Sequence, residues 1–296
     1  MRSSSLFPSS SFSALSIGAF GMLALVGCTT NVGATGEPAS SEVNAAATGI
    51  VVVEGASANE GSRSEAVARF VRTRVGAVDD DALRMAGATV DFPAVGACES
   101  LAGLHGAPGA RAIALLDVGG VMLMAGDAMT TLQARQVPDV ADLVSGVVYS
   151  ARADELPSRG AYVLRIDGSA DLDVPAFVVS ATSPGEPANV RVGRDDGRGA
   201  AVAIAAGAHG TIDVTWEAGA GDDAIYIDVA AATAAPVTRC LFDDSGRAAL
   251  PVSALGAIED GTLAVHRLHR EAFHARGVEP GEVRFDFARV VAFTRR

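Results

Sequence analysis

Three of the five histidines, His266, His269 and His274, fall within nine residues near the end of the chain. Imidazoles can ligate zinc or act as general bases. Zinc peptidases use two histidines four residues apart on a helix, with a glutamate between them, and that spacing is absent. On a strand, residues 266 and 269 point to opposite faces and cannot bind one ion. We therefore expect no metal here and interpret these histidines as surface or turn residues.

Carboxylates offer a second possible chemistry. Asp167, Asp171 and Asp173 lie within seven residues and are the best candidates for a calcium loop. The segment lacks the ligand order, glycine and terminal glutamate of an EF-hand. Aspartate beside glycine also suits a tight turn, which is the interpretation we favour. Other acidic runs are Asp79-Asp80-Asp81, Asp195-Asp196, Asp222-Asp223 and Asp243-Asp244.

Covalent catalysis and phosphate binding have no recognisable motif. The chain has no Gly-x-Ser-x-Gly elbow, and Ser145 and Ser245 lack a strand-to-helix setting. Gly119-Gly120 and Gly197-Arg198-Gly199 lack the lysine and spacing of a phosphate loop. We therefore predict no catalytic residue and no cofactor other than possible calcium. His105 and His209, each next to a glycine, are expected in loops.

Aromatic residues could form a carbohydrate platform. Trp216, Phe285 and Phe287 are in phase with aliphatic residues on their strands, so we expect them in the core. Tyr226 falls on the polar side of its strand and is the one plausible exposed aromatic residue.

The charge and composition narrow the function classes. The formal net charge is −12, and aromatic residues make up only 5% of the 296-residue chain. An acidic surface repels phosphate backbones, which argues against a nucleic-acid partner. The chain is long enough for one large or two modest domains.

The elements that must position these residues are mainly strands. Thr211–Glu217 alternates polar and apolar residues without interruption, as do the segments around Ile225–Val229 and Val283–Phe287. Short helical turns are expected at Val137–Val144 and Val252–Ile258, and Gly55–Ser64 is expected to be a soft connection. We predict an all-β, mostly antiparallel β-sandwich with little helix. Further strands are expected at Ile50–Val53, Val67–Thr73, Ala112–Val118, Val121–Ala125, Ser145–Arg152, Tyr162–Ile166, Ala176–Val179, Val190–Val192, Ala200–Ala206, Val237–Phe242 and Leu263–Leu268.

The N-terminal segment determines the expected location. Leu25-Val26-Gly27-Cys28 follows a short apolar run and resembles the lipobox of bacterial lipoproteins. The resemblance implies removal of residues 1–27 and acylation of Cys28, although an ordinary secretory cleavage site remains an alternative. Thr29 in place of aspartate implies sorting to the outer membrane. Residues 28–49 have the composition of a flexible tether.

Two cysteines remain if Cys28 is acylated. An even number in an oxidising compartment favours one disulfide, between Cys98 and Cys240. Two separate buried thiols are the alternative.

A second resemblance covers residues 96–255 and depends on the order of short motifs. The body is similar to uncharacterised secreted lipoproteins of myxobacteria, which implies a β-sandwich with a cysteine pair and no assigned activity. The chain departs from immunoglobulin domains, because Cys98 precedes Trp216 by more than a hundred residues. The motifs are Gly96-Ala97-Cys98, Asp117-Val118-Gly119-Gly120, Gly160-Ala161-Tyr162-Val163-Leu164, Asp173-Val174-Pro175-Ala176-Phe177, Ser183-Pro184, Asp213-Val214-Thr215-Trp216, Cys240-Leu241-Phe242 and Ala249-Leu250-Pro251.

These observations predict an N-terminal β region over 50–180 and a C-terminal β-sandwich region over 181–296, forming one or two closely coupled domains. The expected function is that of a non-enzymatic cell-envelope lipoprotein that binds or scaffolds a protein or glycan. A hydrolytic or carbohydrate-binding accessory protein of the envelope is the alternative. Membrane attachment would depend on the lipid alone, since no basic patch is present for anionic lipids.

Overall fold

The computed structural model describes residues 47–59, 61–74, 76–104, 112–153, 156–197, 199, 201–205, 210–219, 223–232 and 234–296. The predicted leader, Cys28, His105 and His209 lie outside the described residues. The elements are β1 (Ala47–Ala58), β2 (Gly61–Thr73), α1 (Asp80–Met85), β3 (Cys98–Ser100), α2 (Leu101–Leu104), β4 (Ile113–Leu115), β5 (Val121–Ala125), β6 (Ala128–Val140), β7 (Val144–Ala153), β8 (Gly160–Ile166), η1 (Ala170–Leu172), β9 (Phe177–Ser183), β10 (Arg191–Val192), β11 (Val202–Ile204), β12 (Thr211–Thr215), β13 (Ala224–Ala231), β14 (Pro236–Asp243), β15 (Arg247–Pro251), η2 (Val252–Leu255), β16 (Asp260–Ala275) and β17 (Val278–Arg295).

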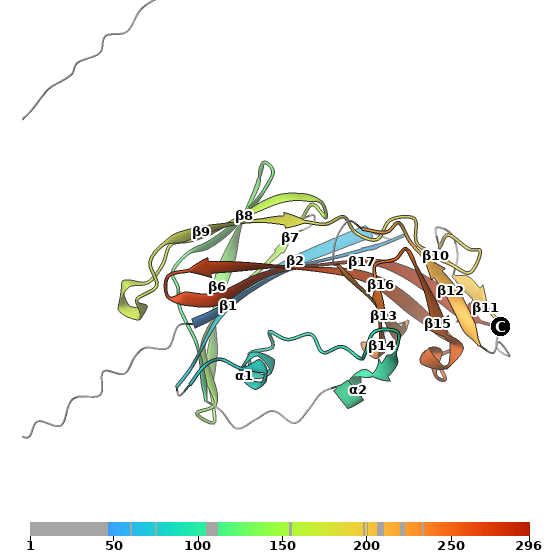
Figure 1. Cartoon of the computed structure of the whole chain (residues 1–296), viewed down its shortest axis with the longest axis horizontal. Coiled ribbons are helices and arrows are strands. Elements are labelled where there is room, and N and C mark those ends of the chain that lie inside the picture. The colour runs from blue at the N-terminus through green and yellow to red at the C-terminus, as the bar shows by residue number, and fades with distance from the viewer. Residues whose placement is uncertain are drawn as a thin grey trace, which may run out of the picture. The chain divides into compact units, whose positions relative to one another are not determined.

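Strands dominate the described chain, and most pairs are antiparallel (Figure 1). The large sheet runs β3-β14-β13-β16-β17-β1-β2-β4-β7-β6-β5-β8-β9, and a small sheet runs β10-β12-β15. The pairs β1–β17, β4–β7 and β11–β17 are parallel. The predicted all-β fold with little helix is confirmed. The first and last strands are neighbours, so the two expected β regions meet within one sheet.

The long β16–β17 hairpin contributes to two separate apolar cores. Near its turn, Phe273, Phe285 and Phe287 pack in the core that also contains β1, β2, β5 and β8. Toward its open end, Val265 and Phe293 pack in the core formed with β12, β13 and β15. One hairpin therefore connects both cores, and residues 47–296 lie within one compact unit.

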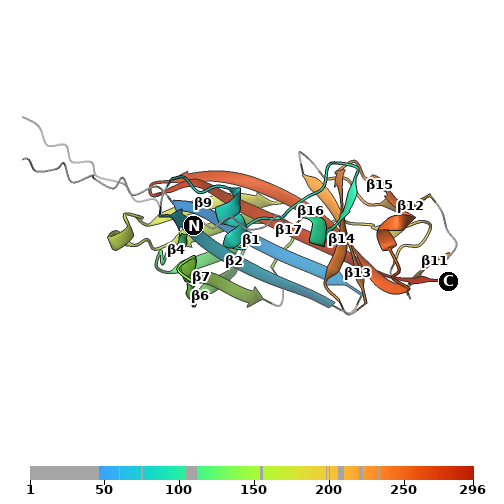
Figure 2. The same ribbon diagram turned by 90° about the horizontal axis from the view of Figure 1, so that it is seen from below.

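A third core explains the uninterrupted apolar start of β1. Val51 and Val53 face the first core, whereas Ile50 and Val52 face the opposite side of the sheet. That side is covered by the strap, which we define as residues 79–100 and which contains α1 and β3. Figure 2 shows this segment passing across the long strands. Burial on both faces favours a continuous apolar strand over an alternating one.

The acidic run at Asp79 begins the strap. The Asp79 carboxylate accepts a hydrogen bond from the Ala82 backbone N–H at 3.0 Å and caps α1. Asp80 and Asp81 occupy the first turn, where negative charge is favoured. This acidic run therefore forms a helix start, which the sequence analysis did not predict.

Three local predictions were wrong. The proposed helix over Val137–Val144 is the β6–β7 turn, with Ala141 and Asp142 at φ of 53° and 59°. Apolar residues spaced by three and four positions flank a reversal of chain direction, which imitates a helical period. The supposed soft stretch Gly55–Ser64 instead continues the β1–β2 hairpin, and β1 begins at Ala47, inside the expected tether. The helical turn expected over Val252–Ile258 is confirmed as η2, which ends earlier, at Leu255.

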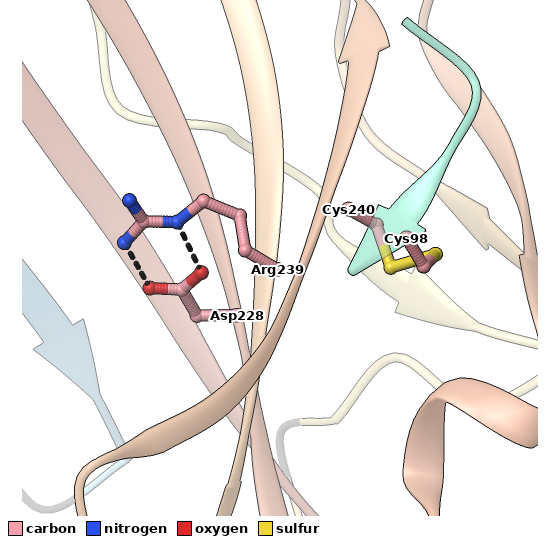
Figure 3. The surroundings of a disulfide bond; sticks show 4 residues. All are labelled: Cys98, Asp228, Arg239 and Cys240. Atoms are coloured by element: carbon pink, nitrogen blue, oxygen red, sulfur yellow. Dashed lines mark hydrogen bonds and ion pairs between the residues drawn. A yellow bond between two sulfur atoms is a disulfide. The ribbon is translucent and has the colours of Figure 1, made fainter. Parts of the chain in front are cut away.

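The expected disulfide joins Cys98 of β3 to Cys240 of β14 (Figure 3). These residues are directly opposite each other in the sheet. The bond closes a sequence separation of 142 residues. A loop of that length corresponds to about 4–5 kcal/mol of stabilisation through the unfolded state. The disulfide fastens the end of the strap to the large sheet.

A disulfide is typical of a protein outside the cytoplasm. Within the part of the chain that the structure describes, no helix is long and apolar enough to cross a membrane.

Candidate functional site

A polar hollow opens beside the end of the β1–β2 hairpin. Its volume is about 700 Å³. Strands β1, β2, β7, β16 and β17 supply the lining, so the side chains stand on adjacent, hydrogen-bonded backbones. The lining residues are Glu54, Gly55, Ala56, Ser62, Arg63, Ser64, Glu65, Arg152, His266 and Asp286.

Sheet register places three carboxylates next to one another. Asp286 of β17 is opposite Glu54 of β1, and Glu54 is opposite Glu65 of β2. We call these three residues the carboxylate row. Arg152 of β7 continues the row and lies 3.8 Å from Glu65, measured from Nε to Oε2. Like charges directly opposite one another destabilise a sheet, so this arrangement has an energetic cost.

His266 is held in place by Asp286. Its Nδ1 lies 2.8 Å from Asp286 Oδ1. An ionised carboxylate only accepts hydrogen bonds, so Nδ1 donates and Nε2 is the ring nitrogen that remains for the hollow. The Tyr226 hydroxyl donates to the other oxygen of Asp286, and its ring stacks on His266 with centroids 4.2 Å apart. Asp286 is only 7% exposed and has a donor on each oxygen.

Tyr226 was expected to be exposed, and this was wrong, because only 2% of its surface is accessible. It does point away from the apolar residues Ile225 and Ile227, but the strap covers that polar face. Phe92 of the strap packs edge-on against Tyr226, with centroids 5.3 Å apart. Arg239 lies over the Tyr226 ring at 4.5 Å. The face predicted to be wet is therefore a buried polar layer.

The strap is held over this layer by arginines of the sheet. Arg239 donates to the Asp91 carbonyl oxygen at 3.2 Å and forms a two-bond ion pair with Asp228 (Figure 3). Arg284 donates to the carbonyl oxygen of Ala88. Both bonds pair backbone carbonyl oxygens of the strap with arginine side chains of the sheet.

One carboxyl group and one phenol group in this region have raised pKa values. Desolvation, and then the negative charges of Asp286 and Glu65, raise the pKa of Glu54, although its side chain stays open to the hollow. Burial, followed by the charge and hydrogen bond of Asp286, raises the pKa of Tyr226 well above its ordinary value. Both shifts favour the protonated form.

The other histidines have separate environments. His269 Nδ1 lies 2.7 Å from Asp223 Oδ1, on the face opposite His266, as strand geometry requires. His274 is exposed, as expected. His266 was interpreted as a surface or turn residue, but it lies in strand β16 with 20% of its side chain accessible. Each of the two paired histidines therefore binds its own aspartate.

The calcium candidates do not converge. Asp167 lies 3.5 Å from Arg165, Asp173 lies 3.2 Å from Arg276, and Asp171 is exposed on η1. Among the described residues, no group of three or more histidine, cysteine, aspartate or glutamate side chains is placed to hold a metal ion.

The aromatic residues predicted to be internal are confirmed as core residues. Trp216, Phe285 and Phe287 are all buried. Glu54, Glu65 and Asp286 were not singled out from the sequence. Each is a single acidic residue on a different strand. The sequence does not reveal that β17, β1 and β2 pair so that these three residues lie opposite one another.

Comparisons with known proteins identify no family for this chain. No family model matches the chain, and no curated protein matches it. A solved structure described as chicken CNTN1 FN1-FN3 domains is similar at 12% sequence identity and a TM-score of 0.24. The match covers 79% of this chain and 78% of that chain.

The buried tyrosines predict a specific alkaline response. The pKa values of Tyr149, Tyr162 and Tyr226 are all raised, chiefly by burial. The folded protein therefore keeps phenol protons that the unfolded chain has lost, and stability should fall as the pH rises above about 10. For Tyr226→Phe, we expect the free energy of unfolding to fall less steeply there, by about 1.4 kcal/mol per pH unit.

Urea unfolding of both proteins at a series of pH values, followed by circular dichroism, measures these slopes. At pH 7, the variant should lose about 1–3 kcal/mol, because Asp286 loses one donor. Equal slopes in the two proteins above pH 10 would contradict the buried position of Tyr226.

Proposed function

We propose that this protein is a non-enzymatic cell-envelope lipoprotein that binds a ligand or partner in the polar hollow. The observation that carries the proposal is the gathering of charged side chains from four strands, together with His266 of a fifth, at one opening. Strands hold side chains more precisely than loops do, which suits a recognition site. The lining contains both carboxylates and guanidinium groups, so it fits a polar partner rather than an apolar one.

The proposed location depends on export. Leu25–Cys28 would supply a lipid anchor, and the disulfide supports an oxidising compartment. The acidic composition supports attachment through the lipid and not through the protein surface. We propose the outer membrane as the destination, on the strength of Thr29.

A hydrolytic role is the second candidate, and the His266–Asp286 pair favours it. An aspartate that fixes one imidazole nitrogen can orient the other as a general base. Ser64 directly precedes Glu65 on β2, so its side chain points to the opposite face of the sheet, where its hydroxyl accepts a hydrogen bond from the Leu156 backbone N–H at 3.0 Å. We prefer binding because the lining offers a base without an identified nucleophile.

The anchor is tested by Cys28→Ser. We expect the variant to move from the membrane pellet to the soluble fraction of the native host, because one acylated sulfur is the proposed attachment. Immunoblotting of fractions separated by ultracentrifugation measures the distribution. Thr29→Ser, which keeps the cysteine, should still pellet. Continued pelleting of Cys28→Ser would exclude the lipid as the attachment.

The binding site is tested by placing a photo-crosslinking amino acid at Arg63, on the rim of the hollow. We expect a crosslinked adduct in intact cells, and we expect Glu65→Arg in the same chain to reduce it because the lining charge changes. Asp127, exposed on the β5–β6 turn, is the matched control position. Mass spectrometry of the adduct identifies the partner. Equal adducts from residues 63 and 127, or none from residue 63, would contradict this site.

A further inference from the structure

The end of the β1–β2 hairpin separates two hollows. We call residues 54–59 and 61–65 the hairpin end. One side lines the 700 Å³ hollow with Glu54 and Glu65. The other side borders a hollow of about 340 Å³, where Leu156 and Phe287 form part of the wall. Any movement of this segment would therefore change both openings.

Hydrogen bonds hold the hairpin end on the side of the smaller hollow. The Ser57 hydroxyl donates to Glu186 Oε2 at 2.7 Å. The Asn59 amide donates to the Gly197 carbonyl oxygen at 2.8 Å, and Arg289 donates to Asn59 Oδ1 at 3.1 Å. These bonds connect the hairpin end to β17 and to the chain that follows β9.

Like charges face one another on the opposite side. Glu54 occupies the centre of the carboxylate row, with Asp286 on one side and Glu65 on the other. Among the described residues, the Glu54 carboxylate has no hydrogen-bond donor within 3.5 Å and no ion-pair partner within 4.0 Å. The charged and titratable groups around it are Asp286 of β17, Glu65, Arg63 and Arg69 of β2, His266 of β16 and Arg152 of β7.

Proton uptake by Glu54 removes both like-charge contacts at once. The protonated carboxyl group also becomes a hydrogen-bond donor toward its acidic neighbours. Because the folded protein raises the pKa of Glu54, the closed arrangement binds this proton more tightly than an opened hairpin does. The resulting stabilisation is present at low pH and is lost as the pH rises through the raised value.

We propose that the hairpin end is a proton-sensitive gate, which closes onto β17 when Glu54 is protonated and opens more readily when Glu54 is ionised. Protonation of Glu54 also changes the charge of the larger hollow, because two carboxylates instead of three then accompany the guanidinium groups of Arg63 and Arg152. The gate regulates the site of the proposed function and in that sense rests on it. Its opening is nevertheless measurable without any ligand, so failure of either proposal can be recognised separately.

Hydrogen exchange of the full mature chain tests the gate. Backbone protection of the hairpin end is measured from about pH 5 to pH 8 and corrected for the intrinsic pH dependence of exchange. We expect protection to fall about two- to fivefold for each like-charge pair as Glu54 ionises. In Glu54→Gln, protection should be nearly independent of pH. In Glu65→Gln, the fall should be about half as large on a logarithmic scale.

Glu99→Gln is the matched control, because Glu99 is an exposed glutamate on β3 outside the row. It should follow the wild-type profile. A wild-type profile without pH dependence, or an unchanged dependence in Glu54→Gln, would overturn the proposal. Loss of protection across β16 and β17 together with the hairpin end would also overturn it, because that result means global unfolding.

Discussion

The sharing of one hairpin by two cores is the constraint on which the rest of this structure depends. β16 and β17 pair over nearly their whole length, and their apolar residues enter the first core near the turn and the second core near the open end. Neither core can lose this hairpin without losing much of its buried apolar surface. The two β regions are therefore expected to unfold together.

A buried ion pair marks the place where the cores meet. Arg267 of β16 is 3% exposed and contacts Asp244 at 2.7 Å. Arg267 also donates to the carbonyl oxygens of Gly185 and Glu217, and the Trp216 indole donates to Asp244. A buried charge is tolerated when it has such partners, and breaking one usually costs about 3–5 kcal/mol. The network fixes the chain after β9 against the hairpin.

The same topology creates the polar hollow from distant parts of the sequence. β1 lies parallel to β17, so residues near 54 and 65 meet residues near 266 and 286. Parallel pairing of the first and last strands forms only when distant segments meet, which gives many long-range contacts. The hollow is thus a product of the completed sheet, and its charges are held there at an electrostatic cost.

The sequence predicts which segments form strands better than it predicts which strands and loops pack beside them. Strict alternation identified strands such as Thr211–Thr215, and the cysteine count led to the disulfide. Alternation also separated His266 from His269, since this depends only on local geometry. Tyr226 was misplaced because the strap that covers it lies more than a hundred residues away in the chain. The carboxylate row was missed for a similar reason, because register between distant strands leaves no local pattern.

Differential scanning calorimetry of the protein tests the shared hairpin most directly. If both cores depend on β16 and β17, residues 47–296 should unfold in one transition whose calorimetric and van't Hoff enthalpies agree. Two resolved transitions, with one core melting while the other remains folded, would contradict this account.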